Sequence, residues 1–589
     1  MTKDVCFDRA RFLSDADFEN CEFRGTASFS GVEFVGLAGF DKVKFNDGAD
    51  FSEADFKEKV SFVGAEFVGV PVFWRTVFRK DALFIRSRYR NEAHFARSVF
   101  SGSAVFLLAE FLGDALFSDV EFSGNALFKH VGFGQIADFD KTQFKGKAEF
   151  SSSVFGKAAT FDNAAFLGAA DFELTEFNGG TTFSETDFSG IAVFHSAKFH
   201  HDAFFFGAQF LREADFGGVF FDRISEFFEA RFLGDASFSA CQFRGFAGFT
   251  KSSFSNGADF EECQFLSSTA FDETVFSGAT YFTNAKFAGT ARFKRTRVGP
   301  YLSFDEAEFA GDGYFQDLDF EERTDRHGAT LNFGSVVIRS IDGVRFEGRG
   351  ERPLDLSRTR FAFTDVSMIR FLNVSFSDKA RAIKAKRRDR FLLWLINRVP
   401  SESVRVYDEE NVRDDYVQKE NRDPRTEKFR TMRWEHVSAI YKSLRESYER
   451  TLKYDEAGQF HIREMETRRY AAGQKGRSNF GKWCRRNLSL LNIYRWLSLY
   501  GESYRLTAIW IFATILLFSV IRWLPQAPMD GNLAGILSSF TTSLDENLGS
   551  SLLAFLQLRS DTTFDLLERL SGAILVILFG MALHRNFKR

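Results

Sequence analysis

The sequence predicts a parallel β-helix, a form of β-solenoid, followed by an α-helical region and two transmembrane helices. Three observations support this prediction. From Phe7 to Phe320, phenylalanine recurs at spacings that alternate between five and six residues; 56 of these 58 positions are Phe, the exceptions being Tyr89 and Val298. The composition changes after residue 376, and two long apolar runs lie near the end of the 589-residue chain. No single helix or flat strand has the alternating spacing, so the array is interpreted as a solenoid of 29 copies of an 11-residue unit.

The 11-residue unit indicates how the solenoid is built. A small residue such as Ala16 or Ala27 stands two positions before most Phe residues, so both side chains point to the same side of an extended backbone. Glycine follows the second Phe of many units by two positions, as at Gly25 and Gly36. We expect this glycine to permit the corner that turns the chain onto the next face.

The unit resembles that of the pentapeptide-repeat proteins, in which Leu or Phe faces inward, a small residue lies two positions before it, and four short faces make each coil. The resemblance implies a right-handed quadrilateral parallel β-helix in which two of these units make one coil. About fourteen coils over residues 7–325 would make a rod about 70 Å long. We predict that the β-helix covers residues 1–376, with an irregular segment at 326–355. The extension to residue 376 rests on apolar residues that return at intervals of five: Leu356, Phe361, Val366, Phe371 and Phe376.

The repeat is least regular around residues 70–98, where basic residues cluster. Pro71 takes a small-residue position, and Trp74 is expected to point outward. Arg75 and Arg97 are one coil apart, and like charges stacked in this way repel each other. A solvated surface is the preferred interpretation, and a site for an anion or a partner is the alternative. That candidate site consists of Trp74, Arg75, Arg79, Arg86, Arg90 and Arg97.

Few features point to chemistry. No Walker loop, G-x-S-x-G, H-E-x-x-H or C-x-x-C motif is present, so we expect no enzyme activity, no catalytic residues and no cofactor. The side chains of the only histidine cluster should diverge, so we expect no metal site there; the cluster is His195, His200 and His201. Three of the five cysteines occupy the small inward position, which predicts core thiols in a reducing compartment; they are Cys21, Cys241 and Cys263.

The charge balance differs between the two parts of the chain. Residues 1–350 carry 52 acidic and 36 basic residues, whereas the remainder carries 28 and 40. Some pentapeptide-repeat proteins mimic DNA with an acidic rod and bind topoisomerases. This function ranks third here because basic residues are interspersed with the acidic ones, and we do not expect the chain to bind nucleic acid.

Residues 377–504 are predicted to form a cytoplasmic helical region. The basic segment 377–398 is interpreted either as a helix on an anionic membrane surface or as a cap over the last coil. Residues 400–425 read as a linker. A helical hairpin is predicted at 430–471, with its second helix at about 456–470. The first helix is indicated by apolar residues at three-and-four spacing: Trp434, Val437, Tyr441, Leu444, Tyr448 and Leu452.

Residues 505–589 are predicted to cross a lipid bilayer twice. The first span is 506–523, whose one charge, Arg522, lies near enough to the end to snorkel. The second is 570–583, extended by Leu566 and Leu567. Basic residues flank the outer ends of the two spans, while the loop 525–569 holds six acidic and two basic residues. The positive-inside rule then predicts a two-pass protein of a bacterial-type inner (plasma) membrane with both termini in the cytoplasm.

The order of span, short apolar helix and span resembles the two-helix pore module of potassium-channel-like proteins. Where that family has T-x-G-Y-G-D, this chain has Leu-Gln-Leu-Arg-Ser-Asp at 556–561, without glycine. Potassium selectivity is therefore not expected. Two interpretations stay open: a plain two-helix anchor, or a pore formed by a homo-oligomer with a re-entrant loop helix. The residues of the predicted pore loop are Gln557, Arg559, Ser560 and Asp561.

The functional prediction is a membrane-anchored scaffold whose cytoplasmic β-helix binds a protein partner that the sequence does not name. The alternative is a channel, not selective for potassium, or a channel-like effector gated through the β-helix. An inhibitor that mimics DNA is the third hypothesis.

Overall fold

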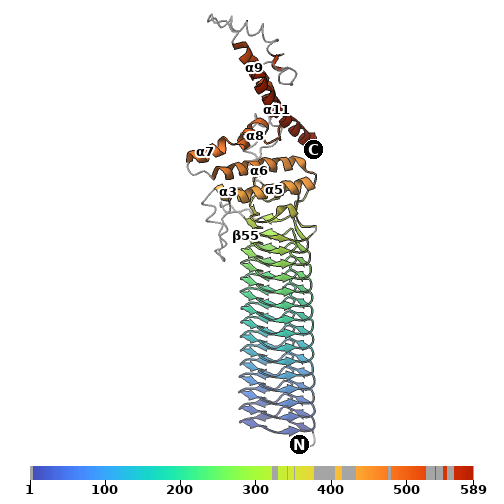
Figure 1. Ribbon diagram of the computed structural model, residues 1–589. Helices are drawn as coiled ribbons and strands as arrows, with labels where there is room; N and C mark the ends of the chain where they lie inside the picture. The colour runs from blue at the N-terminus through green and yellow to red at the C-terminus, as the bar shows by residue number, and fades with distance from the viewer. Residues whose placement is uncertain are drawn as a thin grey trace. The chain divides into compact units, whose positions relative to one another are not determined.

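A computed structural model describes most of the chain and shows the predicted β-solenoid followed by helices (Figure 1). The residues described are 4–320, 329–340, 342–350, 352–376, 405–413, 433–474, 479–524, 538, 548, 550–552 and 563–587. The chain divides into two compact units. One comprises Met1–Leu354 with Leu372–Val374, and the other comprises Asp355–Phe371 with Ser375–Arg589. We call them the solenoid and the helical unit.

The solenoid has about sixteen turns, each made of four short strands. The first turn consists of β1 (Val5–Cys6), β2 (Arg11–Phe12), β3 (Ala16–Asp17) and β4 (Glu22–Phe23). Each strand pairs in parallel with the strand four places later, so that Val5 lies beside Ala27 and Phe12 beside Phe34. This register of 22 positions continues to β58 (Asp319–Phe320), which pairs with β54 (Arg297–Val298). The four faces are therefore four long parallel sheets, as the resemblance to pentapeptide-repeat proteins implied.

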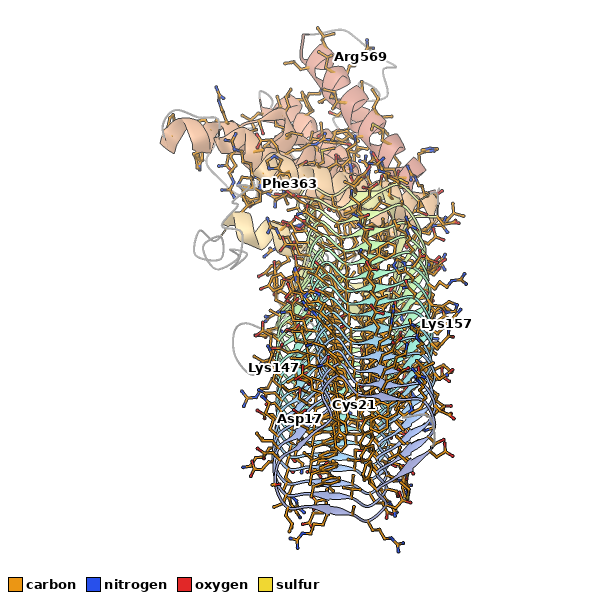
Figure 2. All side chains as sticks on the ribbon, turned by 90° about the horizontal axis from the view of Figure 1, so that it is seen from below. Asp17, Cys21, Lys147, Lys157, Phe363 and Arg569 are labelled. Carbon is orange, nitrogen blue, oxygen red and sulfur yellow. The ribbon has the colours of Figure 1, made fainter. Side chains whose placement is uncertain are left out.

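Stacked phenylalanine rings fill the interior. Rings one turn apart lie almost parallel, as in Phe29 and Phe51, whose centroids are 4.8 Å apart. Rings of different faces meet edge to face, as in Phe40 and Phe51 at 5.4 Å and 86°. Both arrangements suit the quadrupole of an aromatic ring. Figure 2 shows the interior filled with carbon and the nitrogen and oxygen atoms at the outside.

Residues other than glycine make the tightest corners. Every eleventh residue from Arg9 to Asp317 has a positive φ, and only four of these positions are glycine: Gly31, Gly64, Gly207 and Gly218. The glycines that follow the second Phe of a unit do not have positive φ. They are small for another reason, since a Cβ on Gly102 would lie 2.4 Å from the carbonyl carbon of Lys80 one turn below. The prediction that these glycines permit the corner was therefore wrong. They are needed because successive turns stack closely at these positions.

The irregular positions of the repeat remain inside the ladder. Tyr89 is fully buried and stacks on Phe67 and Phe111 at 5.0 and 4.3 Å. Pro71 pairs with Ala49 on one side only, because proline has no N–H to donate to the next strand. Two of the predicted core thiols, Cys241 and Cys263, are fully buried, and Cys21 is partly exposed.

After residue 320 the turns become longer. β59 (Thr330–Asn332) pairs with β55 (Tyr301–Ser303), 29 positions earlier. β61 (Val344–Glu347) pairs with β57 (Gly313–Gln316), 31 positions earlier. The segment predicted to be irregular thus continues the ladder with more residues in each turn. The remaining elements up to residue 376 are β60 (Val337–Ile338), β62 (Leu354–Asp355), β63 (Thr359–Arg360), the 3₁₀ turn η1 (Val366–Met368), β64 (Ile369–Leu372) and β65 (Val374–Ser375).

The helical unit contains α3 (Tyr407–Arg413), α5 (Trp434–Arg450), α6 (Tyr454–Gln474), α7 (Asn479–Asn487), α8 (Leu490–Ser498), α9 (Tyr504–Trp523) and α11 (Thr563–Phe587). Helix α5 packs on η1, and the Tyr448 ring stacks on Phe371 at 6.1 Å. The Ser447 hydroxyl donates a hydrogen bond to the Ile369 carbonyl. Leu452, predicted to belong to the apolar face of this helix, lies beyond its end and is 72% exposed, so that prediction was wrong. Residues 377–398 lie outside the described residues.

Candidate interaction surface and membrane helices

One side of the solenoid, formed by two adjacent faces, carries an aromatic patch. Between residues 4 and 320, five phenylalanines fall outside the periodic series, and all of them lie within residues 204–246. We define the aromatic patch as Phe204, Phe206, Phe220, Phe228 and Phe246 together with Ile224. Each of these side chains is at least partly exposed, and Phe206 and Ile224 are 38% and 41% exposed.

Three successive turns bring the patch together. Phe204 in β37 (Ala203–Phe204) lies beside Glu226 in β41 (Ser225–Glu226), which lies beside Gly248 in β45 (Ala247–Gly248). Phe206 and Phe228 occupy equivalent corner positions one turn apart, with ring centroids 6.4 Å from each other. Phe204 and Phe206 stack at 5.1 Å. Residues of different turns therefore form one surface.

Glu226 is the unusual charge in this surface. Burial raises the pKa of its carboxyl group, and in the described part of the chain the carboxylate has neither a hydrogen bond nor an ion pair. Its Oε2 atom lies where a side chain on Gly248 would begin, since a Cβ built there would be 2.0 Å away. A half-buried carboxylate without a partner is costly, and a cation from outside would relieve that cost.

The exposed ring faces already attract cations. The Lys251 ammonium lies 5.3 Å from the Phe228 ring centre, and the Arg244 guanidinium lies 5.1 Å from that of Phe220. Such contacts arise because the face of an aromatic ring carries partial negative charge. The aromatic patch thus combines apolar area with a preference for positive charge.

The arginines of residues 70–98 are mostly neutralised by their own chain. Arg79 bonds to Asp55 at 2.8 Å and Arg90 to Glu66 at 2.6 Å, and these two pairs lie on different sheets. Arg75 and Arg97 approach Glu53 and Asp119 at 3.8 and 3.6 Å, and Arg75 also covers the Trp74 ring at 4.2 Å. Arg86 has no ion pair among the described residues. The six predicted residues do not form one site but are spread around the solenoid.

The histidine cluster is likewise dispersed into local pairs. His195 lies 3.4 Å from Asp215, and His201 lies 3.7 Å from Asp202. Within the described residues, no group of three or more histidine, cysteine, aspartate or glutamate side chains could hold a metal ion.

Two helices are long and apolar enough to span a membrane, Tyr504–Trp523 and Leu566–Arg585, each with a mean hydropathy of 1.9. Large apolar side chains project from both, including Phe512 at 66% and Ile577 at 62% exposure. The helices pack against each other. Where α9 ends, Arg522 bonds to the fully buried Glu568 of α11 at 2.8 Å. The sequence analysis predicted that Arg522 snorkels to the membrane surface. The structure additionally gives Arg522 an acidic partner.

The predicted pore loop lies outside the described residues. This holds for Gln557, Arg559, Ser560 and Asp561 and for most of the loop 525–569. The pore interpretation therefore stays a prediction from the sequence.

Comparison with known families bears on the solenoid. Residues 1–44, 40–88, 139–187 and 271–319 match the family model of pentapeptide repeats. These stretches of the solenoid consist of pentapeptide repeats. No curated protein and no solved structure matches the chain. The two-helix module matches no family model.

The outward positions of the pentapeptide repeats were the part that sequence reasoning missed. Nearly all phenylalanines that keep the 5/6 register are buried. The useful signal was the opposite one: phenylalanine out of register, at positions where neighbouring turns carry polar residues such as Thr182, Ser184 and Lys198. A pentapeptide-repeat solenoid is a structural repeat fold.

Proposed function

We propose that the chain is a membrane-anchored scaffold whose pentapeptide-repeat solenoid binds a partner protein through the aromatic patch. The observation that carries this proposal is the confinement of all five out-of-register phenylalanines to one surface around Glu226. Exposed aromatic patches rimmed by polar residues are typical of protein interfaces. Helices α9 and α11 would anchor the scaffold as a two-pass hairpin in a bacterial-type inner membrane, with both termini in the cytoplasm.

The chemistry of the patch defines the partner. Phe206 and Phe228 present apolar ring faces, and Glu226 presents a half-buried carboxylate that has no cation beside it among the described residues. A complementary segment would place a lysine or arginine against Glu226 and apolar side chains against the rings. We therefore expect a basic, amphipathic segment of a different protein.

Site-specific photocrosslinking in intact cells tests the partner. A photoreactive phenylalanine analogue would replace Phe206, and the matched control would place it at Leu174, which is 53% exposed elsewhere on the solenoid. We expect one protein, identified by mass spectrometry, to be crosslinked from Phe206 and not from Leu174. The purified partner should then bind the full chain, and Phe206→Ala and Glu226→Gln should each weaken binding about tenfold.

Other occupants give distinct results. Crosslinks to a second copy of this chain alone, or equal yields at both positions, would overturn the proposed partner. Membrane fractionation tests the anchor separately: the full chain should require detergent for extraction, and a soluble full chain would remove that half of the proposal.

The pore alternative is tested in liposomes. We expect no ion flux from the purified, inserted protein, with Arg559→Ala as the comparison. Flux that changes with Arg559 would replace the anchor by a pore that is not selective for potassium.

A further inference from the structure

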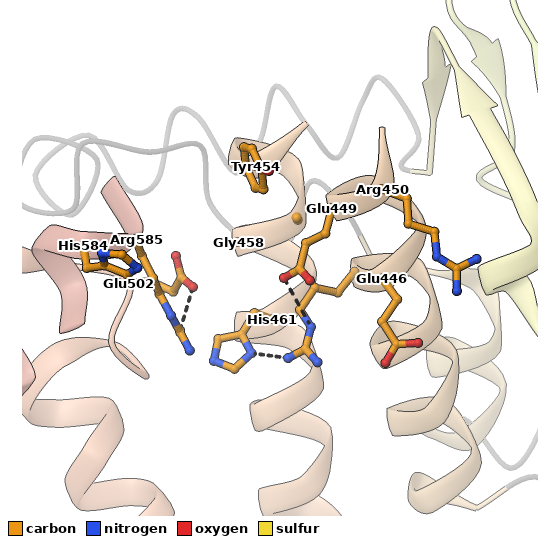
Figure 3. A pocket seen from close by; sticks show the side chains of 11 residues that line it. Glu446, Glu449, Arg450, Tyr454, Gly458, His461, Glu502, His584 and Arg585 are labelled. Carbon is orange, nitrogen blue, oxygen red and sulfur yellow. Dashed lines mark hydrogen bonds and ion pairs between the residues drawn. The ribbon is translucent and has the colours of Figure 1, made fainter. Parts of the chain in front are cut away.

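The helical unit contains a cavity of about 570 Å³ that no function considered so far uses. Helices α5 and α6, residue Glu502 and the end of α11 surround it (Figure 3). Its polar lining comes from Arg445, Glu446, Glu449, Arg450, Tyr454, His461, Glu502, His584 and Arg585. Three arginines and two histidines thus converge on one space with three glutamates.

His461 presents an unused hydrogen-bond donor to this cavity. The side chain is 4% exposed, and its Nδ1 atom lies 2.9 Å from a terminal nitrogen of Arg445. A guanidinium group can only donate, so Nδ1 accepts and the proton of the neutral ring is on Nε2. Glu464 is 3.8 Å from Nδ1, too far for a hydrogen bond. Among the described residues, the buried Nε2 atom has no partner.

An orphaned buried donor indicates a missing acceptor. Leaving such a group unpaired in the interior costs free energy, and a ligand oxygen would recover it. Figure 3 shows the His461 ring between Glu449 and the Arg585–Glu502 pair, inside the pocket. The missing acceptor would therefore belong to a molecule that enters the cavity.

The surroundings favour an anion as that molecule. The cavity is lined by Tyr454, Ala457, Gly458 and His461, all from the first turns of the 21-residue helix α6. The N-terminal end of a helix carries a partial positive charge and free N–H groups that attract anions. Arg450 donates to one backbone carbonyl, that of Ser367 at 3.2 Å, and thus retains donors.

The acidic lining residues are partly committed to other cations. Glu502 accepts from Arg585 at 2.9 Å, Glu446 lies 3.8 Å from Lys442, and Glu449 lies 3.7 Å from Arg445. These contacts use Arg445, which also pairs with Glu464 at 2.9 Å, and Arg585, so that the His461 donor and the spare donors of Arg450 are left for a ligand.

We propose that this cavity binds a phosphate group that accepts from His461 Nε2–H, with Arg450 and the N-terminal end of α6 supplying positive charge at the edge of the cavity. The phosphate could be free in solution or could belong to a lipid headgroup, because the cavity includes Arg585, the last residue of the candidate membrane span within α11. The lipid source rests on the proposed membrane anchoring, whereas the free source does not.

The test uses the full chain and measures hydrogen exchange of residues 454–461. In detergent micelles, inorganic phosphate is titrated against chloride at matched ionic strength. In lipid nanodiscs, phosphatidylglycerol is compared with phosphatidylcholine. His461→Phe removes the donor, and Arg450→Gln removes a cation at a more exposed position, so the second variant decides the outcome if the first does not fold. Arg97→Gln, which removes an exposed arginine of the solenoid outside the cavity lining, is the matched control.

We expect slower exchange in the presence of the ligand, with the affinity reduced about tenfold or more in both cavity variants and unchanged in the control. Protection by inorganic phosphate assigns the free ion, and protection by phosphatidylglycerol alone assigns the headgroup. The absence of protection in both arms, or equal protection in the cavity variants, would overturn the proposal. Either result leaves the membrane fractionation test of the anchor unaffected.

Discussion

In the solenoid, ion pairs such as Arg97 with Asp119 join side chains that are about half exposed, whereas in the helical unit Glu409 and Arg463 pair with exposures of 1% and 5%. The interior of the solenoid contains rings, small apolar residues and occasional hydroxyls. The interior of the helical unit also contains Glu464, Glu466 and Glu568. In a repeat, the same apolar packing serves every turn. Helices of unequal length are instead positioned by particular buried charges. Four substitutions test this comparison.

The largest effect is expected for Arg463→Met. This change leaves Glu409 buried with the Tyr441 hydroxyl at 2.7 Å and the Arg405 guanidinium at 3.8 Å, and removing one partner of a buried ion pair costs about 3–5 kcal/mol. Chemical unfolding followed by the helical circular dichroism signal measures the loss. The double variant with Glu409→Met should recover most of it; a double variant as unstable as the single one would contradict the explanation.

The next effect depends on pH and concerns Asp408. Burial raises the pKa of this carboxyl group from 3.8 to about 6, although the Phe361 N–H donates to it at 2.7 Å. Because the folded pKa is the higher one, the contribution to stability is complete below about pH 4 and is lost as the pH rises through 6. The free energy of unfolding should fall by about 3 kcal/mol over this interval. Asp408→Asn keeps an acceptor for Phe361 and should remove the dependence. Equal pH profiles for the two proteins would show that Asp408 is not the titrating group.

A smaller effect is expected for Tyr89→Phe in the solenoid. The Tyr89 hydroxyl meets the Ser87 hydroxyl at 3.3 Å, and Ser87 retains its bond to the Phe84 carbonyl at 2.7 Å. The substitution restores the repeat and should change the free energy of unfolding by less than about 1 kcal/mol. Thermal unfolding of the two proteins side by side measures this, and a larger loss would reveal a polar role for the ring.

The smallest effect is expected for Arg97→Gln. An exposed ion pair contributes about 0–1 kcal/mol, so the loss of the contact with Asp119 should be near the limit of detection. Unfolding at low and high salt measures it. A strong salt dependence would mean that the exposed pairs of the solenoid act as a network, contrary to the comparison.

The sequence was sufficient for the solenoid because its information is local. The recurrence of Phe every five or six residues determined the turn length and the inward positions, and the strands from β1 to β58 follow it. The reason for the glycines was not local, since the atoms near Gly102 belong to Lys80 and Asp81 in the turn below.

The helical unit could be predicted only in outline. Glu409 and Arg463 are 54 positions apart, and Arg522 and Glu568 are 46 positions apart, so no spacing rule connects them. The His461 cavity was missed for the same reason, because its lining comes from three separate segments. The sequence did show that His461 stands near Glu464. It did not show that Arg445 would donate a hydrogen bond to the Nδ1 atom of His461.

Because the register is constant, the solenoid could be lengthened in two ways. Adding two repeat units anywhere between β1 and β58 would lengthen it by one layer, about 4.8 Å, and leave each outward residue on its original side. Adding a single unit would preserve the ring stacking equally well, yet it would carry everything beyond the insertion half-way around the axis. Phe206 would then face away from residues that it now shares a side with. Inserting a whole turn changes only the length of the solenoid. Inserting half a turn changes the side on which the aromatic patch lies, and it does so without disturbing the core.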